Sequence, residues 1–451
     1  MNITVGTRIL IQGAPHLYYD IVEQLNFSRP VRKQTRYGSG WDTEYVNMVW
    51  GTPIDFSIPA GARHLITEEV KLLTSWEAGK GDPLFDLPGE DRDSQRAVLQ
   101  AIYSAHHRGQ YATCIIAPCG SGKTRMGIRI IGQLGQKTLI LCHTKELQDQ
   151  WVSKLREVFN EEEIGWMKSG KEKPGRIQVA LMQTATKLIS SHREMEWGVV
   201  IVDECHHTPC NTLTDILNII APTVRIGLTA SEKRKDKLHP MIYAYLGPII
   251  SRIDQDSAYG EASAIPPRVC IRTTDFSSGI DAQENYTTLI TALVNNRVRN
   301  LQIIKDILFA YEHGRHTLVL SSRVHHLHEL MNLFAIPCTF GDEVQLLTGT
   351  EPRVKRELAM ANMLSGKSLV TFATTPLAKE GLDAPILDCL IWGTPTADLV
   401  TTQQAVGRIQ RALPGKPKPM VIDYLDTNIG VLRNQYEKRM SVYRKLRADF
   451  V

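Results

Sequence analysis

Two short stretches contain residue types that could carry out phosphate chemistry. The first, "TCIIAPCGSGKTRMGIRII" at 113–131, runs from an apolar β-like segment through a glycine-rich turn into a helical pattern. Glycines let successive backbone N–H groups curl around a phosphate, and the N-terminus of the following helix adds a favourable dipole. We predict a nucleotide-binding loop in which Lys123 reaches the β- and γ-phosphates and Thr124 ligates Mg²⁺. The predicted loop residues are Pro118, Cys119, Gly120, Ser121, Gly122, Lys123 and Thr124.

The loop differs from the pattern GxxxxGK[ST] at one position, because Ala117 stands where the first glycine is expected. The alternative is a glycine-rich turn that binds nothing. Such a turn needs neither a preceding apolar strand nor a following helix, and both patterns are present in the right order. We therefore predict ATP with Mg²⁺ as the bound cofactor.

The second stretch, "VVIVDECHHTPC" at 199–210, has two interpretations. Four of its residues are of metal-binding types: Cys205, His206, His207 and Cys210. The two acids, Asp203 and Glu204, instead follow an apolar run, as acids at the end of a buried strand would. A P-loop ATPase needs such a strand: Asp203 would bind Mg²⁺ through water, and Glu204 would polarise the attacking water. The two histidines are adjacent and so lack the H-x₃₋₅-H spacing of zinc sites, and we therefore favour the acid pair.

The sequence "DECH" at 203–206, together with "APCGSGKT", resembles the ATP-binding motifs of the superfamily 2 DExH helicases. Other stretches resemble the remaining motifs in order: "DRDSQRAVL" at 91–99 (glutamine motif), "HTKELQDQW" at 143–151 (Ia), "MQTATK" at 182–187 (Ib), "LTAS" at 228–231 (III), "LVLSSR" at 318–323 (IV), "TTPLAKEGLDAP" at 374–385 (V) and "QQAVGRIQR" at 403–411 (VI). Motif III usually reads TAT or SAT. The serine here keeps the hydroxyl, so we expect its coupling role to survive.

This resemblance implies roles for residues outside the loop. In the glutamine motif, Gln95 would read adenine beside Arg92. Gly381 and Asp383 of motif V would face the nucleotide, and Gln404 of motif VI would also contact it. Five polar residues of the other motifs would contact the nucleic-acid backbone: Thr144, Gln183, Thr184, Ser322 and Thr374.

Motif VI supplies two candidate arginine fingers, Arg408 and Arg411, spaced three apart as on one helix face. Negative charge builds up on the transferred phosphate, and a guanidinium from the second domain would neutralise it. ATP binding would then draw the two domains together, and hydrolysis would let them part. The alternative is that both are surface arginines.

Hydrophobic patterns divide the chain into four regions. Residues 1–80 predict a small α+β domain with a DNA-binding role, followed by a linker rich in glycine, proline and charge. Over 90–245 and 246–430, short apolar strands alternate with helical patterns, although the pattern is irregular over 236–286. This alternation is typical of parallel sheets covered by helices on both faces. With a C-terminal helix at 431–451, we predict an α/β protein with two tandem RecA-like domains.

The bulk composition is that of a soluble globular protein, with 43% hydrophobic and 22% charged residues. Eight cysteines without a CxxC pair favour reduced thiols in a cytosolic protein. The chain begins without a signal-peptide pattern, and no apolar run approaches the ~20 residues of a membrane span. We therefore expect a cytoplasmic protein with no membrane partner. A net charge of +4 does not by itself indicate nucleic acid.

Two basic regions are candidate DNA contacts. In "RPVRKQTRYGSGW" at 29–41, Arg32, Lys33 and Arg36 could bind phosphates, while Tyr37 and Trp41 could stack on a base. The alternative is a solvated loop between a helix and a strand. The C-terminal helix is expected to pack its apolar face on the second domain. Its six basic residues could face DNA: Arg433, Lys438, Arg439, Arg444, Lys445 and Arg447.

The style of the motifs ("QW" after motif Ia, "LTA", "EGLDAP", "QAVGRIQR") resembles a DNA-directed branch of the superfamily. The compact plan resembles phage recombination helicases of the UvsW kind, T-odd coliphage counterparts included. That resemblance implies a monomeric ATP-dependent DNA helicase in the host-cell cytoplasm, acting on branched, forked or duplex DNA by branch migration, fork reversal and junction unwinding. Two alternatives stay open: a duplex translocase that does not separate strands, and an ATP-gated switch that clamps nucleic acid.

Overall fold

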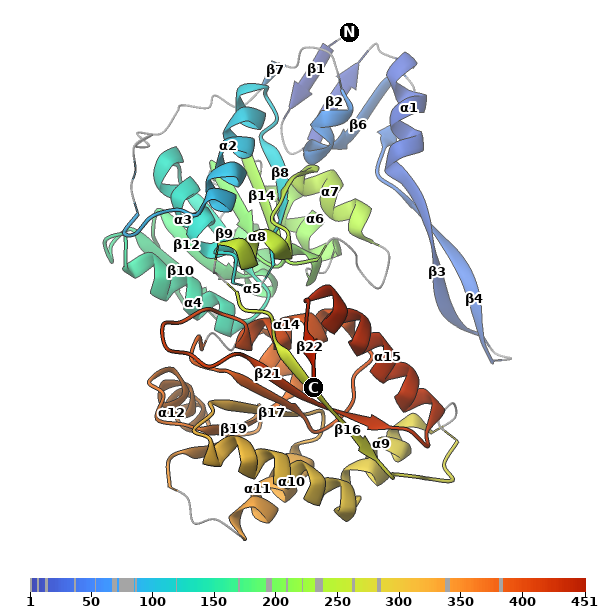
Figure 1. Cartoon of the computed structure of the whole chain (residues 1–451). Helices are drawn as coiled ribbons and strands as arrows, with labels where there is room; N and C mark the ends of the chain where they lie inside the picture. Colours follow the sequence, from blue (N-terminus) through green and yellow to red (C-terminus); the bar gives the residue numbers. More distant parts are fainter. Residues whose placement is uncertain are drawn as a thin grey trace. The chain divides into compact units, whose positions relative to one another are not determined.

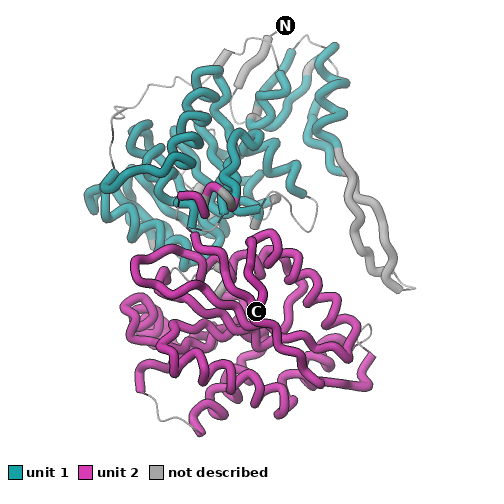
Figure 2. The backbone as a smooth tube through the Cα atoms, viewed as in Figure 1, with its two compact units in different colours: residues 1–254 teal, residues 255–451 magenta. Residues whose placement is uncertain are grey.

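In the computed structural model the chain forms two compact units, residues 1–254 and 255–451 (Figure 2). The structure describes residues 2–5, 8–12, 15–35, 38–52, 54–66, 71–72, 85, 87–118, 120–168, 171–191, 197–207, 210–220, 222–231, 238–261, 264–281, 285–336, 341–380 and 384–451. For several segments, including 27–35 and 38–45, the description covers the backbone alone. None of the described helices is both long and apolar enough to cross a membrane.

The chain begins with a small, mostly antiparallel sheet in the order β5-β6-β2-β1-β7. Its elements are β1 (Asn2–Val5), β2 (Arg8–Gln12), α1 (Pro15–Leu25), β5 (Trp50–Gly51), β6 (Asp55–Pro59), the 3₁₀ helix η1 (Ala60–Leu65) and β7 (Lys71–Leu72). Along β2, Ile9 and Ile11 are buried while Leu10 is 44% exposed. This alternation gives the sheet one buried face, as expected for period-two strands.

A separate two-stranded ribbon, β3 (Asn26–Thr35) and β4 (Gly38–Asn47), is inserted between α1 and β5 (Figure 1). Each strand has ten residues, so the ribbon is about 33 Å long. Most residues of the basic stretch 29–41 belong to these two strands, and Arg32 lies opposite Trp41 and Lys33 opposite Gly40. The stretch is thus largely a hairpin and not a loop between a helix and a strand. Arg36 and Tyr37 lie outside the described residues.

The main sheet of the first unit has eight strands in the order β11-β10-β12-β9-β13-β14-β8-β15, and only β11 runs antiparallel to its neighbour. Its strands are β8 (Ala112–Ile116), β9 (Thr138–Cys142), β10 (Ile164–Lys168), β11 (Lys171–Lys173), β12 (Ile177–Leu181), β13 (Val199–Val202), β14 (Val224–Thr229) and β15 (Ile249–Arg252). Its helical segments are α2 (Asp93–His107), α3 (Lys123–Leu134), α4 (Lys145–Arg156), α5 (Met182–Ser191), η2 (Cys205–His207), α6 (Cys210–Ile219) and α7 (His239–Leu246).

Apolar side chains of successive strand residues enter two different cores, one on each face of this sheet. On β13, Val199 and Ile201 pack with α2, α3 and α4, whereas Val200 and Val202 pack with α5, α6 and α7. The strand is therefore apolar at every position, as strands buried on both faces are. This arrangement confirms the predicted α/β class for this part of the chain.

The expected boundary at 245/246 is corrected to 254/255, because β15 pairs in parallel with β8 and extends the first sheet. The N-terminal sheet also shares its core with this unit, since Ile9, Phe56 and Ile58 belong to the same apolar cluster as Ile242 and Leu246 of α7. At the contact between η1 and α7, a Cβ added to Gly61 would lie 2.4 Å from the carbonyl carbon of Tyr245. Only glycine fits such a close backbone approach.

The second unit contains a parallel seven-stranded sheet in the order β18-β19-β17-β20-β21-β16-β22. Its strands are β16 (Arg268–Thr274), β17 (Thr317–Ser321), β18 (Val344–Leu347), β19 (Val370–Thr374), β20 (Cys389–Trp392), β21 (Met420–Asp426) and β22 (Asp449–Phe450). Its helices are α8 (Gln255–Gly260), α9 (Tyr286–Val294), α10 (Arg297–Glu312), α11 (Val324–Ala335), α12 (Arg353–Leu364), α13 (Thr375–Glu380), α14 (Leu399–Ile409) and α15 (Gly430–Lys445). Helices α10 and α11 pack on one face, and α12, α14 and α15 on the other.

The C-terminal helix α15 packs on this sheet through a face that contains a charged residue. The Arg439 guanidinium donates from Nε and Nη2 to the two carboxylate oxygens of Asp423 on β21, at 2.8 Å each, and both side chains are 1% exposed. Tyr443 donates its hydroxyl to the same carboxylate at 2.8 Å. Arg439 is therefore buried and does not belong to the basic face that was expected to be available to DNA.

Replacing Arg439 by alanine should lower the free energy of unfolding of the second unit by about 3–5 kcal/mol. The change would leave the Asp423 carboxylate buried without its counter-charge, which costs much more than losing an exposed ion pair. Urea denaturation followed by tryptophan fluorescence would measure the difference. The matched control is Arg433→Ala on the exposed face of α15, which should change stability by at most about 0.5 kcal/mol. Equal stability of the two variants would contradict the structural role of Arg439.

Candidate active site

The predicted phosphate loop connects the buried strand β8 to helix α3. Gly120 and Gly122 adopt positive φ angles of 83° and 87°, which glycine takes at no steric cost. Ala117 has no such conformation, so an alanine is tolerated where the pattern has glycine. The Lys123 ammonium donates to the Ala117 carbonyl at 3.1 Å, and the Ser121 hydroxyl donates to the Pro118 carbonyl at 2.8 Å. Cys119 lies outside the described residues.

Residues of the predicted glutamine motif hold this loop in place. The Gln95 side chain is 2% exposed, and its amide donates to the Ser121 carbonyl at 2.9 Å and accepts from the backbone N–H of Arg92 at 3.0 Å. Arg92 in turn donates to the Gly120 carbonyl at 3.1 Å. Gln95 and Arg92 therefore anchor the phosphate loop, a role that the sequence did not predict. The expected reading of adenine by Gln95 stays a prediction.

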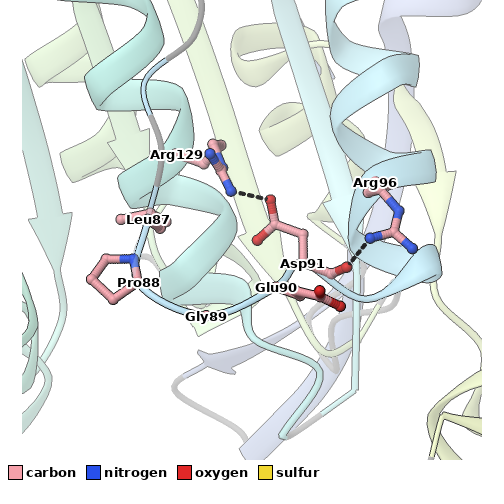
Figure 3. A pocket seen from close by; sticks show the side chains of 7 residues that line it. All are labelled: Leu87, Pro88, Gly89, Glu90, Asp91, Arg96 and Arg129. Carbon is pink, nitrogen blue, oxygen red and sulfur yellow. Dashed lines mark hydrogen bonds and ion pairs between the residues drawn. The ribbon is translucent and has the colours of Figure 1, made fainter.

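A cavity of about 740 Å³ lies between the start of α2 and helix α3 (Figure 3). Its lining residues are Leu87, Pro88, Gly89, Glu90, Asp91, Arg96 and Arg129. The Asp91 carboxylate forms ion pairs at 2.6 Å with Arg125 and with Arg129 of α3, and thereby ties the segment before α2 to the helix that follows the phosphate loop. No local pattern in the sequence indicated this pairing, because the partners are far apart in the chain.

The two acids of "DECH" directly follow strand β13, which is separated from β8 by β14 alone. Glu204 has a φ angle of 46°, a left-handed conformation that is uncommon for a residue with a side chain and often marks a functional site. Its carboxylate lies 3.1 Å from the Lys123 ammonium and accepts from the backbone N–H of Ala230 at 3.3 Å. The structure thus brings the lysine of the loop and the predicted water-activating acid together. Thr124 occupies the second position of α3.

Asp203 is buried, and burial raises the pKa of its carboxyl to about 6. The neighbouring Glu204 adds to this rise, whereas Lys123 and the indole N–H of Trp151 oppose it. A carboxyl with an ordinary pKa would stay charged down to about pH 4. The direction of the shift means that Asp203 loses its charge at a higher pH than an exposed aspartate does.

We expect kcat/KM for ATP to fall as the pH is lowered through about 6, because protonated Asp203 cannot hold Mg²⁺. This parameter reports ionisations of the free enzyme, in which the carboxyl has the raised pKa. The measurement is a rate profile between about pH 5 and pH 8, at fixed concentrations of the magnesium–ATP complex. A profile that stays flat down to pH 5 would contradict the assignment of Asp203.

The histidine of "DECH" connects the acids to motif III. His206 Nδ1 lies 2.7 Å from the Thr229 hydroxyl, a hydrogen-bonding distance, and 3.4 Å from the Glu204 carboxylate. Thr229 also donates to the Ser231 carbonyl at 2.8 Å. His206 and the backbone N–H of Ala230 therefore connect Glu204 with the end of β14.

Two of the four residues in the alternative metal interpretation, Cys205 and His206, have other partners. Cys205 is buried and hydrogen-bonds with Cys114, which together with burial raises the pKa of its thiol. The side chains of His207 and Cys210 lie outside the described residues. Among the described residues, no group of three or more histidine, cysteine or acidic side chains could hold a metal ion.

Motif VI in the second unit differs in part from expectation. Gln404 and Arg408 lie on α14, and Gln404 is buried. The helix ends at Ile409, and Arg411 follows it in an isolated antiparallel bridge with Ala264. The two arginines therefore do not share a helix face, as their spacing had suggested. Gly381 and Asp383 of motif V lie outside the described residues.

The predicted nucleic-acid contacts occupy the ends of strands and the starts of helices. The Thr144 hydroxyl accepts from the backbone N–H of Leu147 at 3.3 Å and so caps α4. Exposed Gln183 and half-buried Thr184 lie in the first turn of α5. In the second unit, exposed Ser322 follows β17, and half-buried Thr374 ends β19. Their role in binding stays a prediction, as does that of Arg32 and Lys33.

A phosphate loop after one buried strand and an acid pair after a nearby parallel strand define the site of a P-loop nucleoside triphosphatase. Residues 89–234 match the model of the type III restriction enzyme res subunit, and residues 299–413 match the helicase conserved C-terminal domain. The chain belongs to the superfamily 2 helicases, which are ATP-dependent, and it resembles helicases of phages and other viruses.

Two relatives illustrate this resemblance. A protein of Acanthamoeba polyphaga mimivirus, L396, named as an ATP-dependent RNA helicase, is 25% identical over 79% of this chain and 68% of its own length. The helicase D10 of Escherichia phage T5 is 28% identical over 74% of this chain and 72% of its own. The second match confirms the predicted resemblance to a T-odd coliphage helicase.

Solved structures agree on the fold. A fragment of an HsdR subunit of a type I restriction enzyme from Vibrio vulnificus superposes with a TM-score of 0.59 at 17% identity, over 92% of this chain and 78% of that one. This match confirms two RecA-like domains. UvsW of phage T4 aligns over 100% of this chain and 99% of its own at 15% identity, with a TM-score of 0.41, which is too low to establish a shared arrangement.

Proposed function

We propose that this helicase is an ATP-driven DNA motor that remodels branched DNA by branch migration, fork reversal and junction unwinding. The observation that supports a motor is the connected set of contacts from Lys123 through Glu204 to Ala230 and, by way of His206, to Thr229. These contacts link the phosphate site to motif III, through which hydrolysis would act on the bound strand. ATP and Mg²⁺ are the proposed cofactors.

Three features support DNA as the substrate. The motif style resembles the DNA-directed branch of the superfamily, one relative is a phage helicase, and the ribbon β3–β4 presents basic and aromatic positions beside each other. On that ribbon Arg29 lies opposite Glu44, Arg32 opposite Trp41 and Lys33 opposite Gly40. RNA is the competing substrate, because the mimivirus relative is named as an RNA helicase.

Steady-state ATPase activity with single-stranded, duplex, forked and four-way DNA, and with RNA as comparator, tests the proposal. Forked and four-way DNA should stimulate turnover most. Strand displacement on forked against blunt duplex separates a helicase from a translocase that leaves the strands paired. An ATP-gated switch would instead bind nucleic acid with little turnover. Stimulation by RNA alone would contradict a DNA substrate.

Replacing Arg32, Lys33 and Arg36 together by alanine should weaken binding to branched DNA and reduce its salt dependence. Each basic side chain that no longer binds a phosphate should lower the slope of log affinity against log salt by about 0.9, so the three would lower it by about 2.7. Basal ATPase activity should persist, because the catalytic residues lie elsewhere. The measurement is fluorescence anisotropy with a four-way junction at several salt concentrations.

A matched control for this variant replaces three basic residues of the first unit that pair with acids on its surface, Lys154, Arg156 and Lys173. This control removes the same charge from the same unit and should change the salt slope much less. If both triple variants processed junctions as the wild type does, the ribbon would not be a DNA-binding element.

A further inference from the structure

Helix α4, which carries motif Ia, is fixed to the first sheet by a buried glutamine. Gln148 is fully buried, and its amide nitrogen donates to the backbone carbonyls of Met167 on β10 and Val179 on β12, at 2.9 Å each. Trp151 follows about one turn later on the same face of the helix. Because Gln148 fixes α4 to the sheet, it also fixes the position from which the Trp151 ring extends.

The ring of Trp151 spans the space between the phosphate-loop helix and the acid pair. Its indole Nε1 donates to Asp203 Oδ2 at 2.8 Å, and both side chains are buried. The opposite edge of the ring packs against α3, where a Cβ added to Gly127 would lie 2.6 Å from Trp151 Cη2. That distance is too short for any side chain, so glycine at this helix position makes room for the indole.

The second oxygen of the aspartate is also held by a donor. Asp203 Oδ1 accepts from the backbone N–H of Glu204 at 2.9 Å. Each carboxylate oxygen thus has one donor, one from Trp151 and one from the main chain. A carboxylate has about four lone-pair sites, so sites remain for water molecules around a metal ion while the group cannot rotate.

We propose that Trp151 is a positioning residue for Mg²⁺ binding, which holds the Asp203 carboxylate in the orientation that the nucleotide-bound metal ion requires. The inference rests on the proposed function, in which Asp203 belongs to the magnesium site. Donors to metal-binding groups typically change metal affinity or activity by about 10- to 100-fold when they are removed. Trp151 does not touch the substrate and acts through Asp203.

The test is the affinity for ADP, measured by isothermal titration calorimetry with Mg²⁺ and with EDTA. The ratio of the two dissociation constants reports the metal without any turnover. Trp151→Phe keeps an aromatic ring but removes the N–H donor, and it should reduce the gain in affinity on adding Mg²⁺ by about tenfold. Affinity in EDTA should change little.

The matched control is Trp197→Phe. Trp197 closely precedes β13, at the opposite end of the strand from Asp203, and is also buried. Its indole N–H has no hydrogen-bond partner among the described residues. This variant makes the same substitution at a second buried tryptophan of the unit and should keep the wild-type response to Mg²⁺.

A double-mutant cycle with Asp203→Asn separates positioning from packing. If Trp151 acts through the carboxylate, Trp151→Phe should have no further effect on the Mg²⁺ response in the Asn background. Should the Phe variant fail to fold, benzothienylalanine at position 151 preserves the shape of the indole and lacks only the N–H. It should reproduce the tenfold reduction.

Two outcomes would overturn the inference: an unchanged Mg²⁺ response in the variants at position 151, or an equal loss in Trp151→Phe and Trp197→Phe. A failure of the proposed function would look different. In that case the wild type itself would bind ADP without any response to Mg²⁺, or would not bind ADP.

Discussion

Replacing Glu204 by glutamine should leave ATP bound and slow its hydrolysis by about two to four orders of magnitude, the range typical of a missing general base. The glutamine keeps the shape of the side chain but cannot polarise water. The Glu204 carboxylate lies at the phosphate loop, 3.1 Å from the Lys123 ammonium and 3.3 Å from the backbone nitrogen of Ala230. Single-turnover hydrolysis and nucleotide titration would measure the two effects separately.

Lys123→Ala provides the informative comparison, because it removes the cation facing the β- and γ-phosphates and should weaken ATP binding as well as hydrolysis. Glu157→Gln, at an exposed position on the same unit, controls for the removal of a negative charge. Hydrolysis by Glu204→Gln at the wild-type rate would show that another group activates the water.

Replacing Arg408 by alanine should lower kcat about a thousandfold, which corresponds to about 4 kcal/mol in the barrier, with a smaller change in ATP affinity. The guanidinium would neutralise charge that exists in the transition state and not in bound ATP. Arg411→Ala tests the second candidate separately, since the chain leaves the helix before this residue. Presteady-state hydrolysis of saturating ATP is the measurement.

Arg444→Ala on α15 removes an exposed arginine of the same unit and should retain wild-type turnover of ATP in the absence of nucleic acid. Full activity in both motif VI variants would mean that neither arginine is a finger. A reduced rate in only one of the two variants would identify the replaced arginine as the finger.

Strands buried on both faces could be predicted from the sequence, and strands with mixed composition could not. Continuous apolar runs such as "VVIV" at 199–202 and "TLVLS" at 317–321 indicated β13 and β17 without reference to any partner. In contrast, β16, "RVCIRTT" at 268–274, is half-exposed and includes Arg272, which pairs with Asp306 of α10. The partners of its polar residues lie far away in the chain, since Thr274 donates to Asp426 of β21, so the local pattern concealed the strand.

In the candidate site, too, features with a local sequence pattern could be predicted and contacts between distant segments could not. The loop and the acid pair are local signals, because neighbouring residues in the sequence perform one task. The contacts of Gln95 with Ser121 and of Trp151 with Asp203 join segments that lie far apart in the chain, and residue type alone does not indicate them. On α15, residue type alone placed Arg439 among the residues that could face DNA, whereas its partner Asp423 on β21 makes it a core residue.

The close fit of Gly61 against the backbone of Tyr245 limits how the chain can be divided. A truncation that removes residues 1–66 would uncover Ile242 and Leu246 of α7, which now pack in the same core as Ile9 and Ile58. Newly exposed apolar surface of this kind promotes aggregation, so a shortened chain would be unsuitable for measuring the activity of the motor domains alone. The ribbon β3–β4 is inserted into this N-terminal sheet, and it would therefore be carried as an extension of the ATP-binding unit rather than as a freely tethered accessory.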